Sequence, residues 1–170
     1  MSYTMPTKVL FLDIDGVLNS MRTCIAFGGY PRLADHELSK FDTTAVGLIR
    51  KLCERAEASV VISSSWRIGS SVNSFGYLEL PIIDMTPVRS FADFRRGLEI
   101  KEWLTDHPEI TGYAIVDDDS DMLEEQLPYF VKINYDDGLT YRDFKALLEV
   151  LSPEEASKFP PPRSLLGVSA

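Results

Sequence analysis

A short apolar run, Lys-Val-Leu-Phe-Leu at residues 8–12, ends abruptly at Asp13-Ile14-Asp15-Gly16. A continuous apolar run bounded by acidic residues and glycine is typical of a strand buried in the centre of a sheet. Asp13 and Asp15 are separated by one residue, so both can point to the same side as the chain leaves the sheet. The run therefore predicts a central strand with two carboxylates at its end.

Further apolar runs alternate with segments of helical periodicity. Strands are predicted at residues 58–62, 81–83, 113–116 and 130–133, and helices from Asp42 to 56, at 96–105, at 121–126 and from Thr140 to 150. Strands that alternate with helices indicate an α/β fold with a mainly parallel sheet. Residues 19–40 have weak periodicity and contain two glycines and a proline, so a loop or small flap is expected there.

The length of 170 residues suits a single domain with a sizeable core. We assign this domain to residues 1–152 and expect residues 153–170, with their three consecutive prolines, to form an extended or mobile tail. No apolar run approaches the roughly 20 residues needed to cross a bilayer, and no signal-peptide pattern is seen. Cys24 and Cys53 match no metal-binding spacing, which favours reduced thiols and a cytoplasmic location.

The net charge of −9 argues against one class of function. A protein that binds nucleic acid along its backbone needs an excess of cations, because every phosphate is an anion. The acidic balance therefore argues against a general nucleic-acid-binding protein. An enzyme that holds one phosphate group in a local basic site remains compatible with it. The sequence carries no signal for an oligomeric state.

A second acidic cluster, Asp117-Asp118-Asp119, follows the strand predicted at 113–116, and Asp121 lies just beyond it. Successive carboxylates at the end of a buried strand are costly unless water or a cation neutralises them. Hard oxygen ligands of this kind suit Mg²⁺. Asp117 is nearest the strand and is the better candidate ligand, whereas Asp119 or Ser120 is expected to cap the following helix.

Hydroxyl groups and cations complete the set of polar clusters. Ser63, Ser64 and Arg67 follow the second strand and could donate hydrogen bonds to a phosphate, although a simple serine-rich turn has the same composition. Arg96 and its neighbour Arg95 begin a predicted helix, where the positive helix end also favours an anion. Lys101 lies further along that helix, and all three cations could equally be surface residues. Most of these clusters follow strands, and the carboxyl ends of parallel strands are where sites form in α/β sheets.

Taken in order, the motifs resemble those of the haloacid dehalogenase-like (HAD) superfamily over residues 7–150. The sequence is more narrowly similar to the HAD domain of Swiss Army Knife RNA-repair proteins in four stretches: Phe11 to Asn19, Ser63 to Arg67, Arg96 to Ile100 and Asp137 to Thr140. The resemblance implies a three-layer Rossmann-like core with a mainly parallel sheet. It also implies a minimal cap or none, because the segments between the motifs are short.

The resemblance assigns catalytic roles to Asp13, Asp15, Ser63 and Arg96. Asp13 would be the nucleophile and Asp15 the general acid and base, while Ser63 and Arg96 would bind the transferring phosphoryl group. The resemblance departs at the cation, which is often lysine in the superfamily, so Arg95 and Lys101 compete with Arg96.

Metal and substrate roles follow from the same resemblance. The implied Mg²⁺ ligands are Asp13, the backbone carbonyl of Asp15, Asp117, and Asp118 or Asp121. The implied substrate contacts are Ser64, Arg67 and Lys101.

The expected function is a Mg²⁺-dependent phosphomonoester hydrolase that works through an aspartyl-phosphate. An open site suits a bulky phosphorylated substrate such as an RNA or DNA end, a nucleotide or a phosphoprotein. Three alternatives share the fold or the acidic residues: a catalytically silent binding module, a phospho-accepting regulatory domain, and a metal-dependent nuclease.

Overall fold

The computed structural model describes residues 7–32, 38–89 and 95–163, and within them the chain forms a five-stranded, all-parallel sheet. The strand order is β3-β2-β1-β4-β5, which places β1 in the middle. The bounds are Lys8–Leu12 for β1, Ser59–Ile62 for β2, Ile82–Met85 for β3, Gly112–Asp117 for β4 and Phe130–Lys132 for β5. The predicted strands are thus confirmed, with β3 beginning one residue later than expected.

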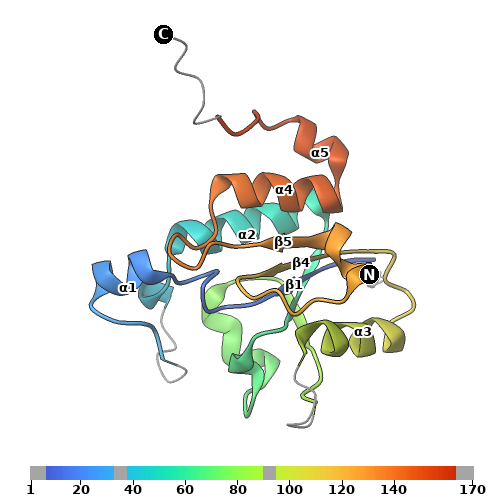
Figure 1. Cartoon of the computed structure of the whole chain (residues 1–170), viewed down its shortest axis with the longest axis horizontal. Helices are drawn as coiled ribbons and strands as arrows, with labels where there is room; N and C mark the ends of the chain where they lie inside the picture. Colours follow the sequence, from blue (N-terminus) through green and yellow to red (C-terminus); the bar gives the residue numbers. More distant parts are fainter. Residues whose placement is uncertain (1–6, 33–37, 90–94, 164–170) are drawn as a thin grey trace, which may run out of the picture.

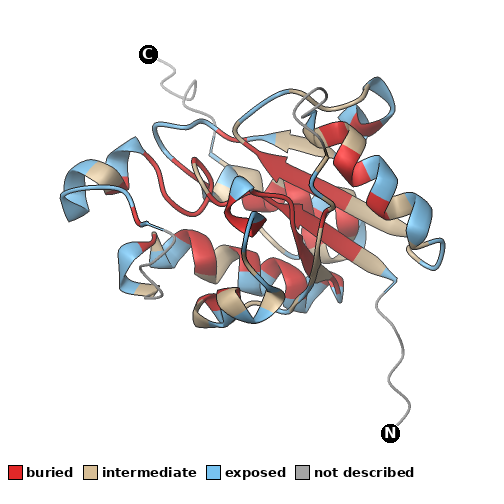
Figure 2. Ribbon diagram, turned by 90° about the horizontal axis from the view of Figure 1, so that it is seen from below, coloured by how far each residue is buried: buried red, intermediate tan, exposed pale blue. Residues whose placement is uncertain are grey.

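Helices cover both faces of this sheet (Figure 1). Helices α2 (Thr43–Ala56) and α4 (Tyr141–Leu151) pack on one face, and α3 (Arg96–Asp106) packs on the other. Figure 2 shows that buried residues run along the strands and along the helix surfaces that face them. The architecture is the three-layer, Rossmann-like α/β core that the sequence predicts.

Alternation along β1 decides which side chain enters which layer. Leu10 and Leu12 belong to the larger core cluster beneath α2 and α4, whereas Val9 and Phe11 belong to the smaller cluster beneath α3. All four side chains are fully buried, because a central parallel strand is covered on both faces. The same alternation assigns Asp13, the next residue after Leu12, to the side of α3.

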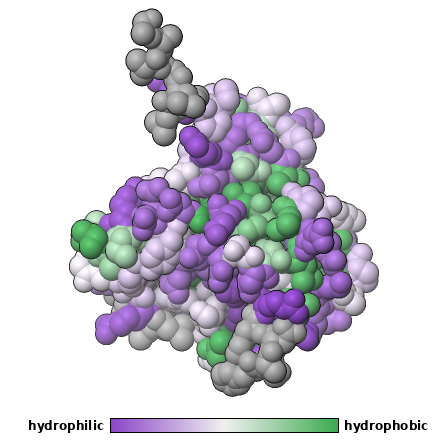
Figure 3. Space-filling view, in the orientation of Figure 1, coloured by the Kyte–Doolittle hydropathy of each residue, from purple (hydrophilic) through white to green (hydrophobic). Residues whose placement is uncertain are grey.

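The segment predicted as a loop or flap, residues 19–40, contains helical structure. Residues Met21–Phe27 form α1, which Ser20 caps at its start and Gly28, at φ +74°, ends in the left-handed region. A short 3₁₀ helix, η1, spans Leu38–Lys40. Helix α1 stands away from the sheet, and the exposed apolar side chains Ile25 and Phe27 lie on it. Hydrophobic atoms appear at the corresponding left edge of Figure 3.

The prediction of a helix at residues 121–126 is wrong in both its position and its helix type. The structure has a 3₁₀ helix, η4, at Glu124–Tyr129, and residues 119–123 are not helical. Pro128 lies inside η4, and a proline has no N–H for a continuing α-helical ladder. Two more 3₁₀ helices, η2 (Ser65–Arg67) and η3 (Val72–Leu78), lie between β2 and β3.

The first residues after Ser152 are helical, although an extended or mobile tail was expected from residue 153 onward. Residues Pro153–Ser157 form α5, which has proline in its first turn and packs on α4. Ala156 is buried, and the ring of Phe159 meets that of Phe144 edge-on at 5.2 Å. The apolar pair Ala156 and Phe159 therefore holds this segment on the core, while residues 164–170 lie outside the described part of the chain.

None of the helices in the described ranges is long and apolar enough to cross a membrane.

Candidate active site

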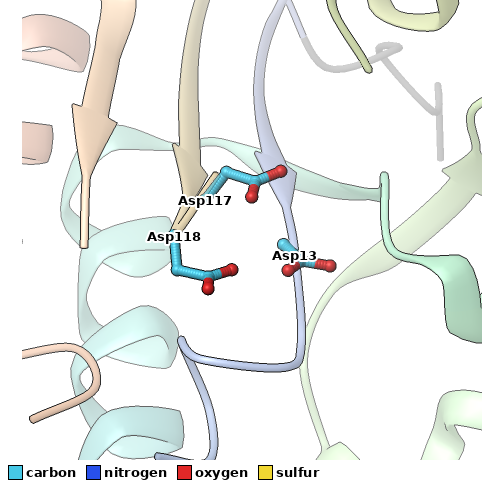
Figure 4. Close-up of side chains that lie close together, drawn as sticks. All are labelled: Asp13, Asp117 and Asp118. Atoms are coloured by element: carbon cyan, nitrogen blue, oxygen red, sulfur yellow. The ribbon is translucent and has the colours of Figure 1, made fainter. Parts of the chain in front are cut away.

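Two strand ends bring the acidic clusters together. The β1–β4 register pairs Leu12 with Val116, and the Asp13 N–H donates to the Val116 carbonyl at 3.1 Å. Asp13 therefore stands beside Asp117, and Asp118 follows. Figure 4 shows the three carboxyl groups turned toward a common space, and one oxygen from each lies within 4.8 Å of the others.

The three carboxyl groups of this cluster outnumber the cation that faces them, Arg96. Asp13 is 5% exposed and Asp117 is fully buried. Burial, followed by the negative charge of Asp117, raises the pKa of Asp13. Burial likewise raises the pKa of Asp117 and of Asp118. One oxygen of Asp117, Oδ2, has no hydrogen-bond partner among the described residues. Three crowded carboxyl groups, each with an oxygen within 4.8 Å of the others, form a donor set that fits a hard divalent cation such as Mg²⁺.

Arg96 supplies the positive charge that faces this cluster. Its Nε lies 3.2 Å from Asp117 Oδ2, and one terminal nitrogen lies 3.8 Å from Asp13 Oδ1. The side chain is 17% exposed, so part of it remains accessible to solvent. Asp121 holds the first turn of α3 in place by accepting the Arg96 backbone N–H at 2.7 Å. Of the two assistants that the sequence left open, Asp118 joins the cluster and Asp121 positions Arg96.

Asp15 is held apart from the three-carboxylate cluster by hydrogen bonds to both of its oxygens. The indole Nε1 of Trp66 donates to Oδ2 at 2.8 Å, and the amide of Asn19 donates to Oδ1 at 2.9 Å. Asn19 Oδ1 in turn accepts the Gly16 N–H at 3.1 Å, which closes the loop after β1. Sequence reasoning gave no role to Asn19 or Trp66, although both lie within the motifs that carry the resemblance.

Gly16 lets this loop pass against Asp118. Its φ is +73°, and a Cβ built there would lie 2.5 Å from Asp118 Cγ. That separation is far below van der Waals contact, so only glycine fits without moving the carboxylate. The glycine next to Asp15 thus shapes the cluster as well as the turn.

The two serines after β2 stand next to Asp13. The Ser63 N–H donates to the Leu12 carbonyl at 2.9 Å, and both serine side chains are fully buried. Ser64 forms a side-chain hydrogen bond with Asp13 that favours its ionised form, opposing the rise in pKa. The Ser63 hydroxyl has no hydrogen-bond partner in the described part of the chain. A buried hydroxyl without a partner beside Asp13 is a ready donor for an oxygen of a bound group.

Arg67 and Lys101, the two cations expected to contact the substrate, each form an ion pair with a glutamate. Arg67 is buried and pairs with Glu99 at 2.6 Å, and it also donates to the carbonyls of Ser64, Thr86 and Pro87. Lys101 is exposed and pairs with Glu125 at 2.8 Å on the outer side of α3. Residue type and spacing could not distinguish a cation that binds phosphate from one that ties two elements together.

Comparison with known proteins gives one family and no individual relative. Residues 9–144 match the family described as the HAD domain in Swiss Army Knife RNA repair proteins. No curated protein and no solved structure matches the chain. A HAD domain implies a hydrolase of the phosphatase type that acts on a phosphorylated substrate. The match covers most of the chain and includes both acidic clusters, the serines and Arg96; the chain belongs to this HAD family.

Proposed function

We propose that this protein is a Mg²⁺-dependent phosphomonoester hydrolase that acts through an aspartyl-phosphate on Asp13. The observation that carries the proposal is the cluster of the buried Asp13 and Asp117 with the partly buried Asp118, and Arg96 lies 3.2 Å from Asp117. Asp13, Asp117 and Asp118 would hold the metal. Bound there, Mg²⁺ would offset the repulsion between the carboxylates and a phosphate dianion.

In the first half of the reaction, an oxygen of Asp13 attacks phosphorus and the bond to the leaving oxygen breaks. Asp15 gives its proton to that leaving oxygen, and the bonds from Trp66 and Asn19 fix the direction in which it does so. The Ser63 hydroxyl and the Arg96 guanidinium bind the remaining phosphoryl oxygens, whose charge grows in the transition state.

In the second half, Asp15 takes a proton from water. The water oxygen attacks phosphorus, the bond to Asp13 breaks, and phosphate leaves with Asp13 restored as a carboxylate. Two aspartates with different surroundings support this division of labour. Asp13 lies in the acidic cluster, whereas Asp15 is partly exposed and is held by two neutral donors.

The proposed substrates are RNA or DNA ends or nucleotides, which the description of the family suggests. Within the described residues, the segments between the motifs form α1, the 3₁₀ helices and β3 and no separate cap domain, so the site is open to a large substrate.

The test is phosphate release from p-nitrophenyl phosphate and from oligonucleotides phosphorylated at the 5′ or the 3′ end, with and without Mg²⁺. Asp13→Asn should abolish release, whereas Asp106→Asn, a change to an exposed carboxylate at the end of α3, should not. Release that persists in Asp13→Asn would overturn the aspartyl-phosphate mechanism. A stable phosphoprotein without turnover would instead indicate a phospho-accepting domain, and internal cleavage of the oligonucleotide would indicate a nuclease.

A further inference from the structure

A cavity of about 510 Å³ opens beside Asp15. Its walls are mainly aromatic, and the residues that line it are Asp15, Tyr30, Pro31, Ser65, Trp66 and Tyr135. The volume lies in the range that small-molecule sites occupy, roughly 300–1,000 Å³. Asp13, Asp117 and Asp118 are not among these residues, so the cavity adjoins the catalytic cluster and is distinct from it.

Tyr30 and Tyr135 form one wall of the cavity. Their ring centroids are 6.2 Å apart, and the Tyr135 hydroxyl donates to the Tyr30 hydroxyl at 2.7 Å. They are 37% and 39% exposed, which is a large aromatic surface to leave open to water. The Met21 N–H, at the start of α1, donates to the Tyr135 carbonyl at 3.2 Å, so the segment that leads to Tyr30 is also bonded to the backbone of Tyr135. The wall is therefore made by two distant parts of the chain.

Trp66 links the cavity to Asp15, the proposed general acid. Its indole is 7% exposed, donates to Asp15 at 2.8 Å and packs against Phe41 with ring centroids 5.6 Å apart. Since Trp66 and Asp15 both line the cavity, whatever fills it lies next to the carboxyl group that protonates the leaving oxygen. The cavity is thus on the side of the leaving group.

The charge of the lining residues restricts the chemical class of leaving group that the cavity can bind. Among the described lining residues, Asp15 is the carboxylic acid and none is arginine, lysine or histidine. These residues offer no cation to a second phosphate or to an acidic peptide. A neutral planar ring with polar edges would find aromatic faces to stack on and the hydroxyls of Ser65, Tyr30 and Tyr135 at its rim.

We propose that this cavity binds the base of the nucleoside whose phosphate is cleaved, with Tyr30 and Tyr135 as the stacking side chains. The inference rests on the proposed function, because it takes Asp15 as the group that faces the leaving oxygen. It adds that recognition extends over one nucleoside and depends on stacking. The acidic chain then needs no basic track along a nucleic-acid strand.

The experiment compares trinucleotides, phosphorylated at whichever end the protein prefers, whose terminal nucleoside is either intact or abasic. Wild type should show a kcat/KM roughly 10- to 100-fold higher for the intact form, from the usual strength of base stacking. Tyr135→Ala should remove most of that ratio by lowering kcat/KM for the intact form alone. Tyr129→Ala, which removes a similarly exposed tyrosine outside the cavity lining, should leave the ratio unchanged.

The outcomes separate this inference from the proposed function. Equal kcat/KM for intact and abasic forms would overturn the base site while leaving the phosphatase in place. A higher kcat/KM for a phosphotyrosine peptide would also overturn it, by assigning the cavity to a different aromatic leaving group. If no substrate releases phosphate, adenosine binding followed by saturation-transfer NMR decides the matter. Binding that is lost in Tyr135→Ala supports the base site, and absent or unchanged binding overturns it.

Discussion

Trp66 donates its indole N–H to Asp15 across 51 positions of sequence, at 2.8 Å, and so links the loop after β2 to the loop after β1. A second tryptophan makes the same type of bond outside the site, since Trp103 donates to Asp84 at 2.7 Å. Both indoles are more than nine-tenths buried. The pair offers a direct way to separate a role in positioning Asp15 from a role in packing.

We expect Trp66→Phe to lower kcat for p-nitrophenyl phosphate by roughly 10-fold, which corresponds to about 1.4 kcal/mol, as for the loss of one hydrogen bond to a charged group. The phenyl ring keeps most of the packing of the indole. The substitution therefore removes mainly the hydrogen bond that orients the Asp15 carboxyl group. Trp103→Phe is the matched control and should retain wild-type kcat. An equal drop in both variants would mean that general loss of packing, and not Asp15, is responsible.

Mg²⁺ should stabilise the wild-type protein against heat. Metal that binds only the folded state adds about 2.7 kcal/mol at a concentration 100 times its Kd. Asp117→Asn removes one of three crowded carboxylates, so we expect it to raise Tm in the absence of metal and to lose most of the Mg²⁺-dependent shift. Differential scanning fluorimetry with and without Mg²⁺ measures both effects. A Mg²⁺ shift that survives in Asp117→Asn would place the metal elsewhere.

Gly16→Ala tests the close approach of the first loop to Asp118. The added Cβ would lie 2.5 Å from Asp118 Cγ at a φ of +73°, so the carboxylate or the loop must move. We expect weaker Mg²⁺ binding and at least a 10-fold loss of phosphatase activity. Gly47→Ala is the control, because Gly47 lies in α2 with no atom within 4 Å of an added Cβ. That change should be neutral or stabilising by roughly 0.5–1 kcal/mol.

Arg96 lies beside Asp13 and Asp117, whereas Lys101, which competes with it on sequence, pairs with Glu125. Arg96→Ala should lower kcat/KM for p-nitrophenyl phosphate by roughly 100-fold, because it removes the guanidinium that faces Asp13 and Asp117. Lys101→Ala should change it less than twofold, since its partner Glu125 is exposed. The reverse pattern in steady-state kinetics would return the role to Lys101.

Arg67→Met should destabilise the protein by roughly 3–5 kcal/mol, because it leaves the buried Glu99 carboxylate without its ion pair. Replacing Glu99 with leucine in the same chain should recover most of that loss. Arg22→Met is the control and should cost less than about 1 kcal/mol, because Arg22 pairs with Asp42 while 60% exposed. Urea denaturation measures all three, and similar losses for Arg67→Met and Arg22→Met would contradict the buried-pair assignment.

The sheet could be predicted from sequence because its strands are buried on both faces. Continuous apolar runs such as residues 8–12 have few alternative placements in a globular chain. Asp13 and Asp117 were predictable for the same reason, since each follows directly from such a run and the register then aligns them.

Features that depend on tertiary contacts could not be predicted from the sequence. Nothing in Ser-Ser-Ser-Trp-Arg indicates that Arg67 pairs with Glu99 at 2.6 Å. The tail was expected to be extended because three prolines dominate its composition, whereas Ala156 and Phe159, just before them, are what dock it. The hydrogen bond from Trp66 to Asp15 joins two loops and leaves no periodic signal.

The Arg67–Glu99 pair also makes the surface loop at Gly69 a tolerant place for new sequence. The pair fixes the loop that carries Ser63 and Ser64 to the helix that carries Arg96, so the two halves of the proposed phosphate site stay in register when the loop between η2 and η3 changes. Gly69 is exposed, has φ +75° and has no atom within 4 Å of an added Cβ. Lengthening a surface loop costs only about 0.6 kcal/mol per doubling. A lid or a targeting module could therefore be grafted at Gly69 without rebuilding the catalytic centre.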